Sequence, residues 1–322
     1  MLKNYKPILV VAGEPYSIFL EIFFKTLKKN NFKKPIILIV SKNLFLHQMK
    51  KLNFNYKINL LDFKNINYGN LSLKKINIID VKFKFKKAFD EITNKSNKYI
   101  SESFKIALFL LKSEKFSGLI NGPISKKNFL KTKHLGITEY LAKQTKTNKV
   151  AMLIYNPKLS VSPITTHLPV KDVYKNITKN RIINHVKLIN EFYKKFFKKE
   201  PVIAITGLNP HCESNYESSE EDRIIKPTIK NLVNNAYKVH GPFAADTIFM
   251  RNQIKKYNVV LGMYHDQVLT PVKTLFGFNA INITLGLPFL RISPDHGPNA
   301  KMLGKNSSDP TSLTWALKFL DK

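Results

Sequence analysis

Short apolar segments alternate with amphipathic segments along the first part of the chain. Apolar runs at 8–12, 36–40 and 118–123 have the length of buried parallel strands. Between them, apolar positions at helical spacing fall around 17–29 and 97–115. Strands and helices therefore alternate, which is typical of an α/β sheet with helical crossovers.

The same alternation continues in the rest of the chain. We expect further strands at 151–155, 202–206, 258–264 and 280–286 and in a run ending at Thr165-Thr166-His167, and helices near 178–198, 219–235 and 310–320. No internal repeat or low-complexity linker interrupts this pattern. Because 322 residues exceed what one compact core usually holds, the sequence predicts a two-domain α/β protein.

Polar residues follow several of the expected strands directly. They are Gly13-Glu14-Pro15, Asn121-Gly122-Pro123, Leu208-Asn209-Pro210-His211 and His265-Asp266-Gln267. Ligands of open α/β sheets bind beyond the carboxyl ends of the strands. We therefore expect these residues to converge on a ligand site.

The formal net charge of +31 raises the question of nucleic-acid binding. Lysine carries nearly all of this charge, and the four arginines are Arg181, Arg223, Arg251 and Arg291. Nucleic-acid sites favour the planar fork of arginine, and the lysines spread over the chain as on solvated helix faces. We expect no specific nucleic-acid partner.

Other features of the sequence bear on its surroundings. No apolar stretch is long enough to cross a bilayer, and the first residues lack the pattern of a secretory signal. The single cysteine, Cys212, cannot form an intramolecular disulfide. The sequence thus predicts a cytoplasmic protein without a membrane partner.

Three histidines end strand-like runs: His167, His211 and His265. Neutral imidazole is the commonest ligand of Zn²⁺ and similar ions, and catalytic sites typically use three protein ligands. The spacing alone has little specificity, so structural histidines stay an open alternative.

Other candidate site residues are charged. Lys273 and Arg291 lie in the sequence near Asn282 and could hold a phosphate or carboxylate, or could simply be surface charges. Asp246, taken alone, fits a helix cap better than a role in metal binding or proton transfer. The chain contains no GxGxxG, P-loop or GxSxG motif, so a nucleotide cofactor must be bound without them.

A series of motifs occurs in order along nearly the whole chain. It comprises Gly13-Glu14-Pro15, Asn121-Gly122-Pro123-Ile124-Ser125-Lys126, Thr138-Glu139-Tyr140, Thr166-His167-Leu168-Pro169, Gly207-Leu208-Asn209-Pro210-His211, Ala245-Asp246-Thr247, Met263-Tyr264-His265-Asp266-Gln267 and Asn282-Ile283-Thr284-Leu285-Gly286-Leu287-Pro288-Phe289. Each motif is weak alone, but the ordered set resembles the family of 4-hydroxythreonine-4-phosphate dehydrogenases.

The resemblance implies the isocitrate/isopropylmalate dehydrogenase-like two-domain α/β fold. An outer domain would comprise 1–135 together with 287–322, and a central domain for dimerisation and metal binding would comprise 136–286. The active sites would lie in the interdomain cleft and be shared across a homodimer.

The resemblance also implies site residues and chemistry. The metal ligands for Zn, Mg or Co would be His167, His211 and His265. The substrate would be bound by Thr138, Lys273, Asn282 and Arg291, and the catalytic residues would be Lys273 and Asp246. NAD or NADP would be bound by His296 and Gly297. The implied reaction oxidises 4-phosphooxy-L-threonine to 2-amino-3-oxo-4-phosphooxybutanoate, which decarboxylates to 3-amino-2-oxopropyl phosphate in pyridoxal 5'-phosphate (vitamin B6) synthesis.

The chain departs from the family pattern at three places. Ile137 replaces a histidine that contacts substrate, the loop after Gly13-Glu14-Pro15 carries larger residues at 16–19 in place of glycines, and Pro298-Asn299 replaces a Thr-Ala pair. Two alternatives follow from these departures. The substrate could be a phosphorylated threonate or erythronate or a dihydrodiol, or the chain could be a non-catalytic relative with a basic binding surface.

Overall fold

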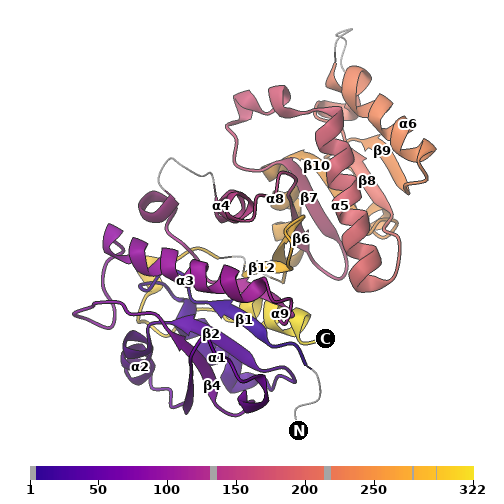
Figure 1. The fold of residues 1–322 in the computed structure, drawn as a ribbon. Helices are drawn as coiled ribbons and strands as arrows, with labels where there is room; N and C mark the ends of the chain where they lie inside the picture. The colour runs from indigo at the N-terminus through magenta and orange to yellow at the C-terminus, as the bar shows by residue number, and fades with distance from the viewer. Residues whose placement is uncertain (1–4, 131–135, 214–218, 278, 295) are drawn as a thin grey trace. The chain divides into compact units, whose positions relative to one another are not determined.

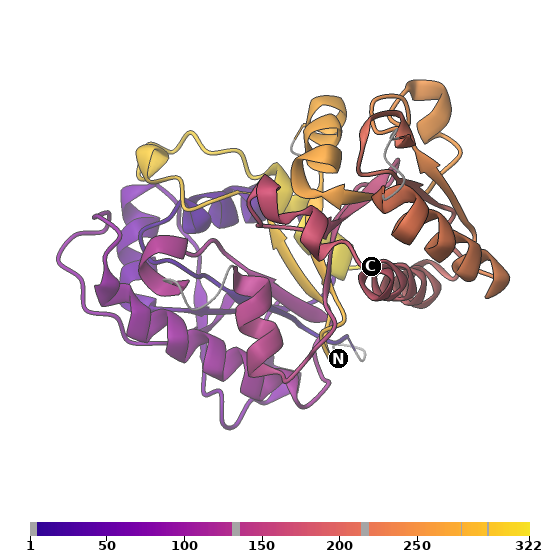
Figure 2. The same cartoon turned by 90° about the horizontal axis from the view of Figure 1, so that it is seen from above.

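The computed structural model describes residues 5–130, 136–213, 219–277, 279–294 and 296–322. The chain forms two compact units, Met1–Tyr140 with Phe289–Lys322, and Leu141–Pro288. Both units combine a sheet with helices, so the predicted α/β class is confirmed. Figure 2 shows the yellow C-terminal segment returning to the unit formed by the indigo and purple part of the chain.

A parallel sheet forms the centre of the first unit, with the strand order β3-β4-β2-β1-β5-β12. Its strands are β1 (Ile8–Val11), β2 (Ile36–Val40), β3 (Ile58–Leu61), β4 (Ile76–Asp80), β5 (Gly118–Asn121) and β12 (Arg291–Pro294). The central strand β1 is fully buried, as a near-continuous apolar run in a parallel sheet requires.

Helices cover this sheet on its faces. They are α1 (Phe19–Lys29), α2 (Lys42–Lys51), α3 (Asn97–Leu111) and α9 (Thr311–Leu320), and α4 (Ile137–Gln144) begins in the same unit. Figure 1 shows α3 passing across β1 and β2, which it contacts, whereas α1 contacts α2 and α9. The apolar face of α1 places Phe19, Phe23 and Phe24 in the core.

A mixed sheet forms the second unit, with the strand order β11-β6-β7-β10-β8-β9. Its strands are β6 (Ala151–Tyr155), β7 (Ser160–Thr165), β8 (Ile203–Thr206), β9 (Val239–Phe243), β10 (Val259–Tyr264) and β11 (Ile281–Leu285). β7, β10, β8 and β9 run parallel to one another, whereas β6 is antiparallel to both β7 and β11. The carboxyl ends of β7, β10 and β8 therefore lie side by side.

The helices of the second unit are α5 (Lys179–Phe197), α6 (Lys226–Asn234), α7 (Arg251–Ile254) and α8 (His265–Phe276). Thr178 caps α5 by accepting a hydrogen bond from the Arg181 amide. The core beneath α8 includes Val161, Val260 and Val268. Since α8 begins at the residue after β10, it fixes His265 at the end of that strand.

Every strand expected from the apolar runs is present, as are the helices at the positions expected. The helix expected near 219–235 begins as a π-helical turn at Glu221–Ile225 and continues as α6. The sequence pattern missed the strands β3, β4, β9 and β12 and the helices α2, α4 and α8. β3 is only partly buried, β9 contains Gly241-Pro242, and α8 contains Pro271, so each gives a weak periodic signal.

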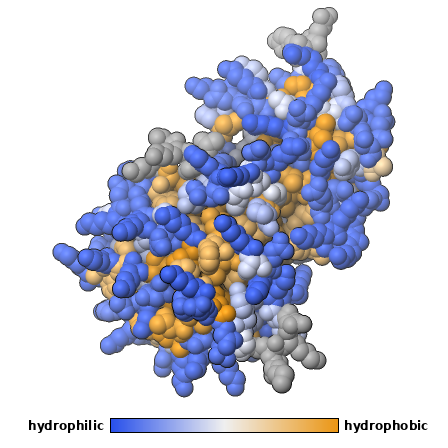
Figure 3. Space-filling model, viewed as in Figure 1, coloured by the Kyte–Doolittle hydropathy of each residue, from blue (hydrophilic) through white to orange (hydrophobic). Residues whose placement is uncertain are grey.

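Hydrophilic residues predominate on the visible face of each unit (Figure 3). This agrees with the expectation that the many lysines are mainly solvated. In the part of the chain that the structure describes, we find no helix with the length and apolarity needed to cross a membrane.

Candidate active site

Arg291 is the buried cation of the first unit. Its side chain is 1% exposed at the start of β12. Its Nε donates a 2.7 Å hydrogen bond to Oδ1 of Asn121, at the end of β5, and Nη1 donates a 3.3 Å hydrogen bond to Oγ1 of Thr138. Burial lowers the pKa of Arg291 to about 10, against the opposing effect of the Glu139 carboxylate. The guanidinium therefore stays charged at neutral pH.

The structure thus brings together two residues that the sequence assigns to substrate binding, Thr138 and Arg291. A buried guanidinium beside a hydroxyl is suited to an anionic ligand because charge-assisted hydrogen bonds are strongest where water is excluded. Asn121 and Glu139 also lie near Arg291. They were not singled out as site residues, although both lie in motifs of the ordered set. Ile137 is the first residue of α4 and immediately precedes Thr138.

Glu14 is a buried carboxyl beyond the end of β1. It is 2% exposed, and among the residues that the structure describes neither of its side-chain oxygens has a hydrogen-bond partner. Burial raises the pKa of Glu14 to about 7, although the nearby Ser96 hydroxyl acts in the opposite direction. Near neutral pH this carboxyl therefore carries a proton in a substantial fraction of molecules.

The loops at 16–19 and 298–299, where the chain departs from the family pattern, touch each other. The Ile18 amide donates a 3.2 Å hydrogen bond to the carbonyl oxygen of Pro298. Ser17 donates from its hydroxyl to the carbonyl oxygen of Glu14 at 2.8 Å, which shapes the first loop. The two departures therefore belong to one local structure, next to the predicted cofactor residues His296 and Gly297.

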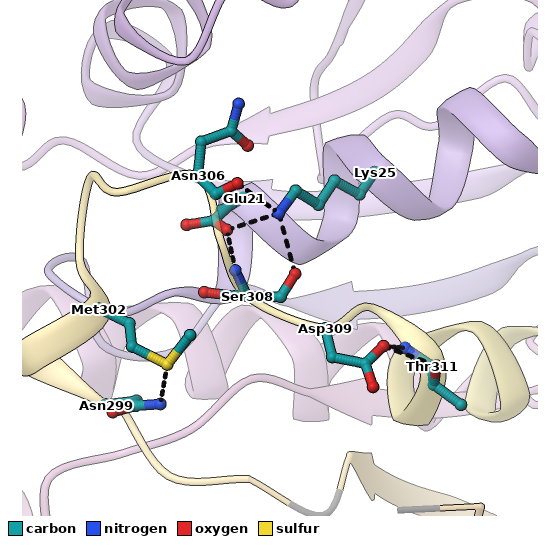
Figure 4. Close-up of polar contacts among 8 residues, drawn as sticks. All are labelled: Glu21, Lys25, Asn299, Met302, Asn306, Ser308, Asp309 and Thr311. Atoms are coloured by element: carbon teal, nitrogen blue, oxygen red, sulfur yellow. Dashed lines mark hydrogen bonds and ion pairs between the residues drawn. The ribbon is translucent and has the colours of Figure 1, made fainter.

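Figure 4 shows how α1 holds the segment that follows these residues. The Glu21 carboxylate accepts hydrogen bonds from Nζ of Lys25 at 2.8 Å and from the Ser308 amide at 2.5 Å. Lys25 also donates to the carbonyl oxygens of Asn306 and Ser308, each at 2.9 Å. The loop after β12 is thus fixed to the amino-terminal part of α1 at two places, Ile18 and the Glu21–Lys25 pair.

The three histidines predicted as metal ligands, His167, His211 and His265, follow neighbouring parallel strands of the second unit. His167 comes two residues after β7, His265 directly after β10, and His211 lies in the turn Pro210–Cys212 beyond β8. The rings of His167 and His265 have centroids 6.0 Å apart. His211 is exposed and has a left-handed backbone with φ of 58°. Such a conformation costs a non-glycine residue on the order of 1 kcal/mol, so its surroundings must stabilise it.

The pair His167 and His265 fits two ligands of one metal ion. A bound imidazole places its ring centroid roughly 3.2 Å from the ion, so two ligands of one ion have centroids roughly 4.5 to 6.4 Å apart. His265 also forms a 2.6 Å contact from Nδ1 to Oδ1 of Asp266, the arrangement that typically orients a ligating imidazole. Within the described ranges of this single chain, no group of three or more His, Cys, Asp or Glu residues could hold a metal ion.

Buried hydrogen bonds tie together the strand ends that precede the histidines. Thr165 donates from its hydroxyl to the carbonyl oxygen of Met263 at 2.8 Å. Oε1 of Gln267 accepts from the Met263 amide at 2.7 Å and from the Thr206 hydroxyl at 2.9 Å, and Nε2 of Gln267 donates to the carbonyl oxygen of Gly207 at 2.8 Å. These bonds fix β7, β10 and β8 relative to one another where the three histidine loops begin.

The remaining predicted residues of this unit lie on three separate elements. Asp246 is exposed in the turn after β9, and because Met250 precedes the first residue of α7, Asp246 caps no helix that the structure describes, so the preference for a cap was wrong. Its charge helps raise the pKa of Cys212, after burial and the Glu221 charge. Lys273 is exposed on α8, and Asn282 in β11 has a buried Oδ1 for which the described part of the chain supplies no hydrogen-bond partner.

A buried guanidinium that contacts the carboxyl end of β5, and imidazoles that follow parallel strands, are typical of an α/β enzyme with a small-molecule site. Comparison with known proteins identifies the family of enzymes to which this chain belongs. The model of the family described as pyridoxal phosphate biosynthetic protein PdxA matches residues 31–320, and the chain belongs to this family.

Individual relatives agree with this assignment. A 4-hydroxythreonine-4-phosphate dehydrogenase of Sulfurihydrogenibium sp. (strain YO3AOP1) is 37% identical over 97% of this chain and 96% of its own length. The crystal structure of a 4-hydroxythreonine-4-phosphate dehydrogenase from Klebsiella pneumoniae has a TM-score of 0.84 and 27% identity, and the match covers 98% of each chain. A relative from Oceanobacillus iheyensis, named provisionally for D-threonate 4-phosphate dehydrogenase, is 29% identical over 97% of this chain and 96% of its own. A dehydrogenase family implies a nicotinamide cofactor and a divalent metal.

Proposed function

We propose that this chain is an NAD(P)-dependent dehydrogenase that oxidises 4-phosphooxy-L-threonine at its C3 alcohol. Hydride passes to the nicotinamide, and the product, 2-amino-3-oxo-4-phosphooxybutanoate, loses CO₂ to give 3-amino-2-oxopropyl phosphate, a step of pyridoxal phosphate synthesis. The observation that carries the proposal is full-length similarity to 4-hydroxythreonine-4-phosphate dehydrogenases in a chain whose buried Arg291 donates a hydrogen bond to Thr138.

The proposed roles follow the chemistry of each side chain. Arg291, Thr138, Lys273 and Asn282 hold the anionic and polar ends of the substrate and so orient its C3–H bond. Asp246 and Lys273 are the proposed groups for proton transfer near the reacting carbon. His296 and Gly297 are proposed to contact NAD or NADP. A divalent ion (Zn, Mg or Co) bound by His167, His211 and His265 would lower the pKa of the alcohol and stabilise negative charge during decarboxylation.

We further propose that the working form is a cytoplasmic homodimer whose active sites are shared between subunits. The central part of the chain, 136–286, would supply the dimer contacts. This assembly is supported by the histidine geometry, because the described residues of one chain give a candidate ligand pair but no cluster of three. Sedimentation equilibrium of the purified protein tests the assembly directly, and a monomer with full activity would contradict it.

The test of the activity is a reduction assay with purified protein. We expect NAD⁺ or NADP⁺ to be reduced on addition of 4-phosphooxy-L-threonine in the presence of Zn²⁺, Mg²⁺ or Co²⁺, with loss of activity on chelation. Unphosphorylated 4-hydroxy-L-threonine serves as the matched control for the phosphate. Turnover of neither compound under any metal and cofactor condition would contradict the proposal.

A second candidate substrate is D-threonate 4-phosphate. It is favoured by Ile137, which stands where the family uses a substrate-contacting histidine, and by the Oceanobacillus iheyensis relative. The two substrates share the phosphate and differ at C2, where an amine is replaced by a hydroxyl. The same assay with both compounds therefore separates the candidates by the ratio of their kcat/KM values.

A further inference from the structure

Glu221 is a fully buried carboxylate that the proposed chemistry does not use. It is 0% exposed in the π-helical turn Glu221–Ile225 before α6. Its Oε1 accepts hydrogen bonds from the amides of Leu208 at 2.7 Å and Asn209 at 2.9 Å. Its Oε2 accepts from Nδ2 of Asn209 at 2.8 Å. All three donors lie in the loop that leads to His211.

These hydrogen bonds decide the state of the carboxyl group. Burial raises the pKa of Glu221, but the hydrogen bonds from Asn209 and Leu208 outweigh burial and leave the pKa below its ordinary value. A carboxylate that has no solvent contact, and whose two oxygens already accept three hydrogen bonds from the loop, is not exposed to a substrate. Its function must therefore be exerted through the loop it holds.

The loop requires such support because its backbone is unusual. His211 and Cys212 both have left-handed φ values, 58° and 59°. A Cβ atom added at Gly207 would lie 2.7 Å from Sγ of Cys212 and 3.0 Å from Oε1 of Glu221, so the loop folds closely around this carboxylate. On the other side of the same residue, Gln267 holds the carbonyl oxygen of Gly207.

We propose that Glu221 is a positioning residue that presents the His211 imidazole for metal binding. The proposal rests on the proposed function, in which His211 is a metal ligand. Without the carboxylate, Asn209 loses two acceptors and Leu208 loses one. The loop then relaxes from its left-handed turn, and His211 spends less time where an ion can be bound.

The experiment measures metal affinity of the purified full-length protein in addition to activity. Co²⁺ is titrated into metal-free protein, and the absorption bands of bound Co²⁺ report the ligand geometry. Glu221→Gln keeps the shape of the side chain but replaces one acceptor with a donor and removes the charge. We expect Co²⁺ affinity to fall about 10-fold to 100-fold, as for other groups that orient a ligand, and the spectrum to change.

The matched control is Asp222→Asn, which removes the neighbouring carboxylate. Asp222 is 52% exposed and pairs with Lys226 rather than with the His211 loop. We expect its Co²⁺ affinity to stay within about twofold of wild type, because a surface ion pair contributes little. A fall equal to that of Glu221→Gln would overturn the proposal, since loss of negative charge alone would then explain both.

His211→Ala separates the positioning proposal from the proposed function. If His211→Ala abolishes Co²⁺ binding while Glu221→Gln binds with wild-type affinity and spectrum, positioning is overturned and the metal assignment stands. A Glu221→Gln protein that loses thermal stability but binds Co²⁺ as wild type does also overturns positioning. If His211→Ala binds Co²⁺ as wild type does, the ligand assignment fails, and the positioning proposal fails with it.

Discussion

The two units bury a carboxyl group beyond a parallel strand in opposite ways. Glu14, beyond β1, is 2% exposed, its oxygens have no hydrogen-bond partner within the described ranges of the chain, and its pKa rises to about 7. Glu221, which holds the loop beyond β8, is 0% exposed with three N–H donors, and its pKa falls. Burial is therefore the same in both, and hydrogen bonding decides the charge.

The difference extends to the side chains with chemistry. In the first unit the charged group itself, Arg291, is buried and donates a hydrogen bond to Asn121. In the second unit the buried groups are supports, Glu221 and Gln267, and the histidines His167 and His211 are exposed. A ligand site can thus be rigid because its functional group is packed, or because the loop that carries the group is fixed from beneath.

The largest effect is expected where a proposed metal ligand of the second unit is removed. His211→Ala should abolish bound metal and lower kcat/KM by about 1000-fold or more, because the implied metal supplies charge stabilisation worth several kcal/mol. His240→Ala, which removes an exposed histidine on β9, is the control and should leave both unchanged. Elemental analysis and steady-state kinetics measure the two quantities. A His211→Ala protein with its full metal complement would show that the fixed loop does not serve a ligand.

The second prediction compares how Glu14 and Glu221 change the pH dependence of stability. The folded pKa of Glu14, about 7, exceeds its ordinary value of 4.5, so its contribution to stability is complete below about pH 4.5 and is lost as pH rises through 7. Above pH 7 the ionised group therefore costs up to about 3 kcal/mol relative to a neutral side chain. Glu14→Gln should be more stable than wild type at about pH 8 and nearly equal to it at about pH 4.5.

Glu221→Gln should show the opposite sign. Its folded pKa is lowered, so its contribution is present above the ordinary pKa and is lost as pH falls through the folded value. Wild type should thus be more stable than Glu221→Gln at about pH 8, with the gap closing in acid. Urea unfolding at several pH values measures both variants. If the difference in free energy of unfolding between Glu14→Gln and wild type did not change with pH, Glu14 would have partners that keep it ionised.

Much of the fold and the positions of the histidines at strand ends could be predicted from the sequence, because buried strands appear in it as apolar runs. The rule that ligands bind at strand ends placed His167 and His265 at the same edge, and the structure confirms that these two rings are neighbours. The contact of Arg291 with Asn121 could not be predicted, since β12 is four residues long and the two residues are 170 positions apart. Likewise, residues 219–235 have the pattern of an amphipathic helix, and nothing in that period distinguishes Glu221, which holds a distant loop, from a solvated glutamate. The residues that contact a buried charge depend on the tertiary structure, which local sequence patterns do not specify.

The third prediction concerns the exposed cation of the second unit. Lys273 is proposed to hold the substrate's anionic end, and a charge-assisted hydrogen bond contributes about 1.5 to 3 kcal/mol. Lys273→Ala should therefore raise KM for the phosphorylated substrate about 10-fold to 100-fold without changing the fold, because the side chain is exposed. Lys255→Ala, an exposed lysine of the same unit, is the control. Equal effects on 4-hydroxy-L-threonine and its phosphate would show that Lys273 does not face a phosphate.

The smallest effect is expected at Ile137, beside the buried cation of the first unit. Isoleucine has no hydrogen-bond donor. The oxygens of an anion near Thr138 must therefore accept hydrogen bonds from the Thr138 hydroxyl, the Arg291 guanidinium and other cations, because an unpaired buried oxygen costs free energy of binding. Ile137→His introduces the side chain that the resemblance implies at this position, and one added neutral hydrogen bond contributes about 1 kcal/mol, or about fivefold in KM.

The matched control for this change is Ile137→Leu, which keeps the site apolar at the same volume. We expect Ile137→His to lower KM for the phosphorylated substrate by about fivefold and to leave the dephosphorylated compound unchanged, because only the phosphate gains a donor. Steady-state kinetics of the three proteins on both compounds measure these effects. If KM for D-threonate 4-phosphate were already low in wild type and rose in Ile137→His, isoleucine would be an adaptation to that substrate. The residues around Arg291, Ile137 among them, would then determine the choice of substrate. The proposed metal ligands His167, His211 and His265 would supply the chemistry common to both substrates.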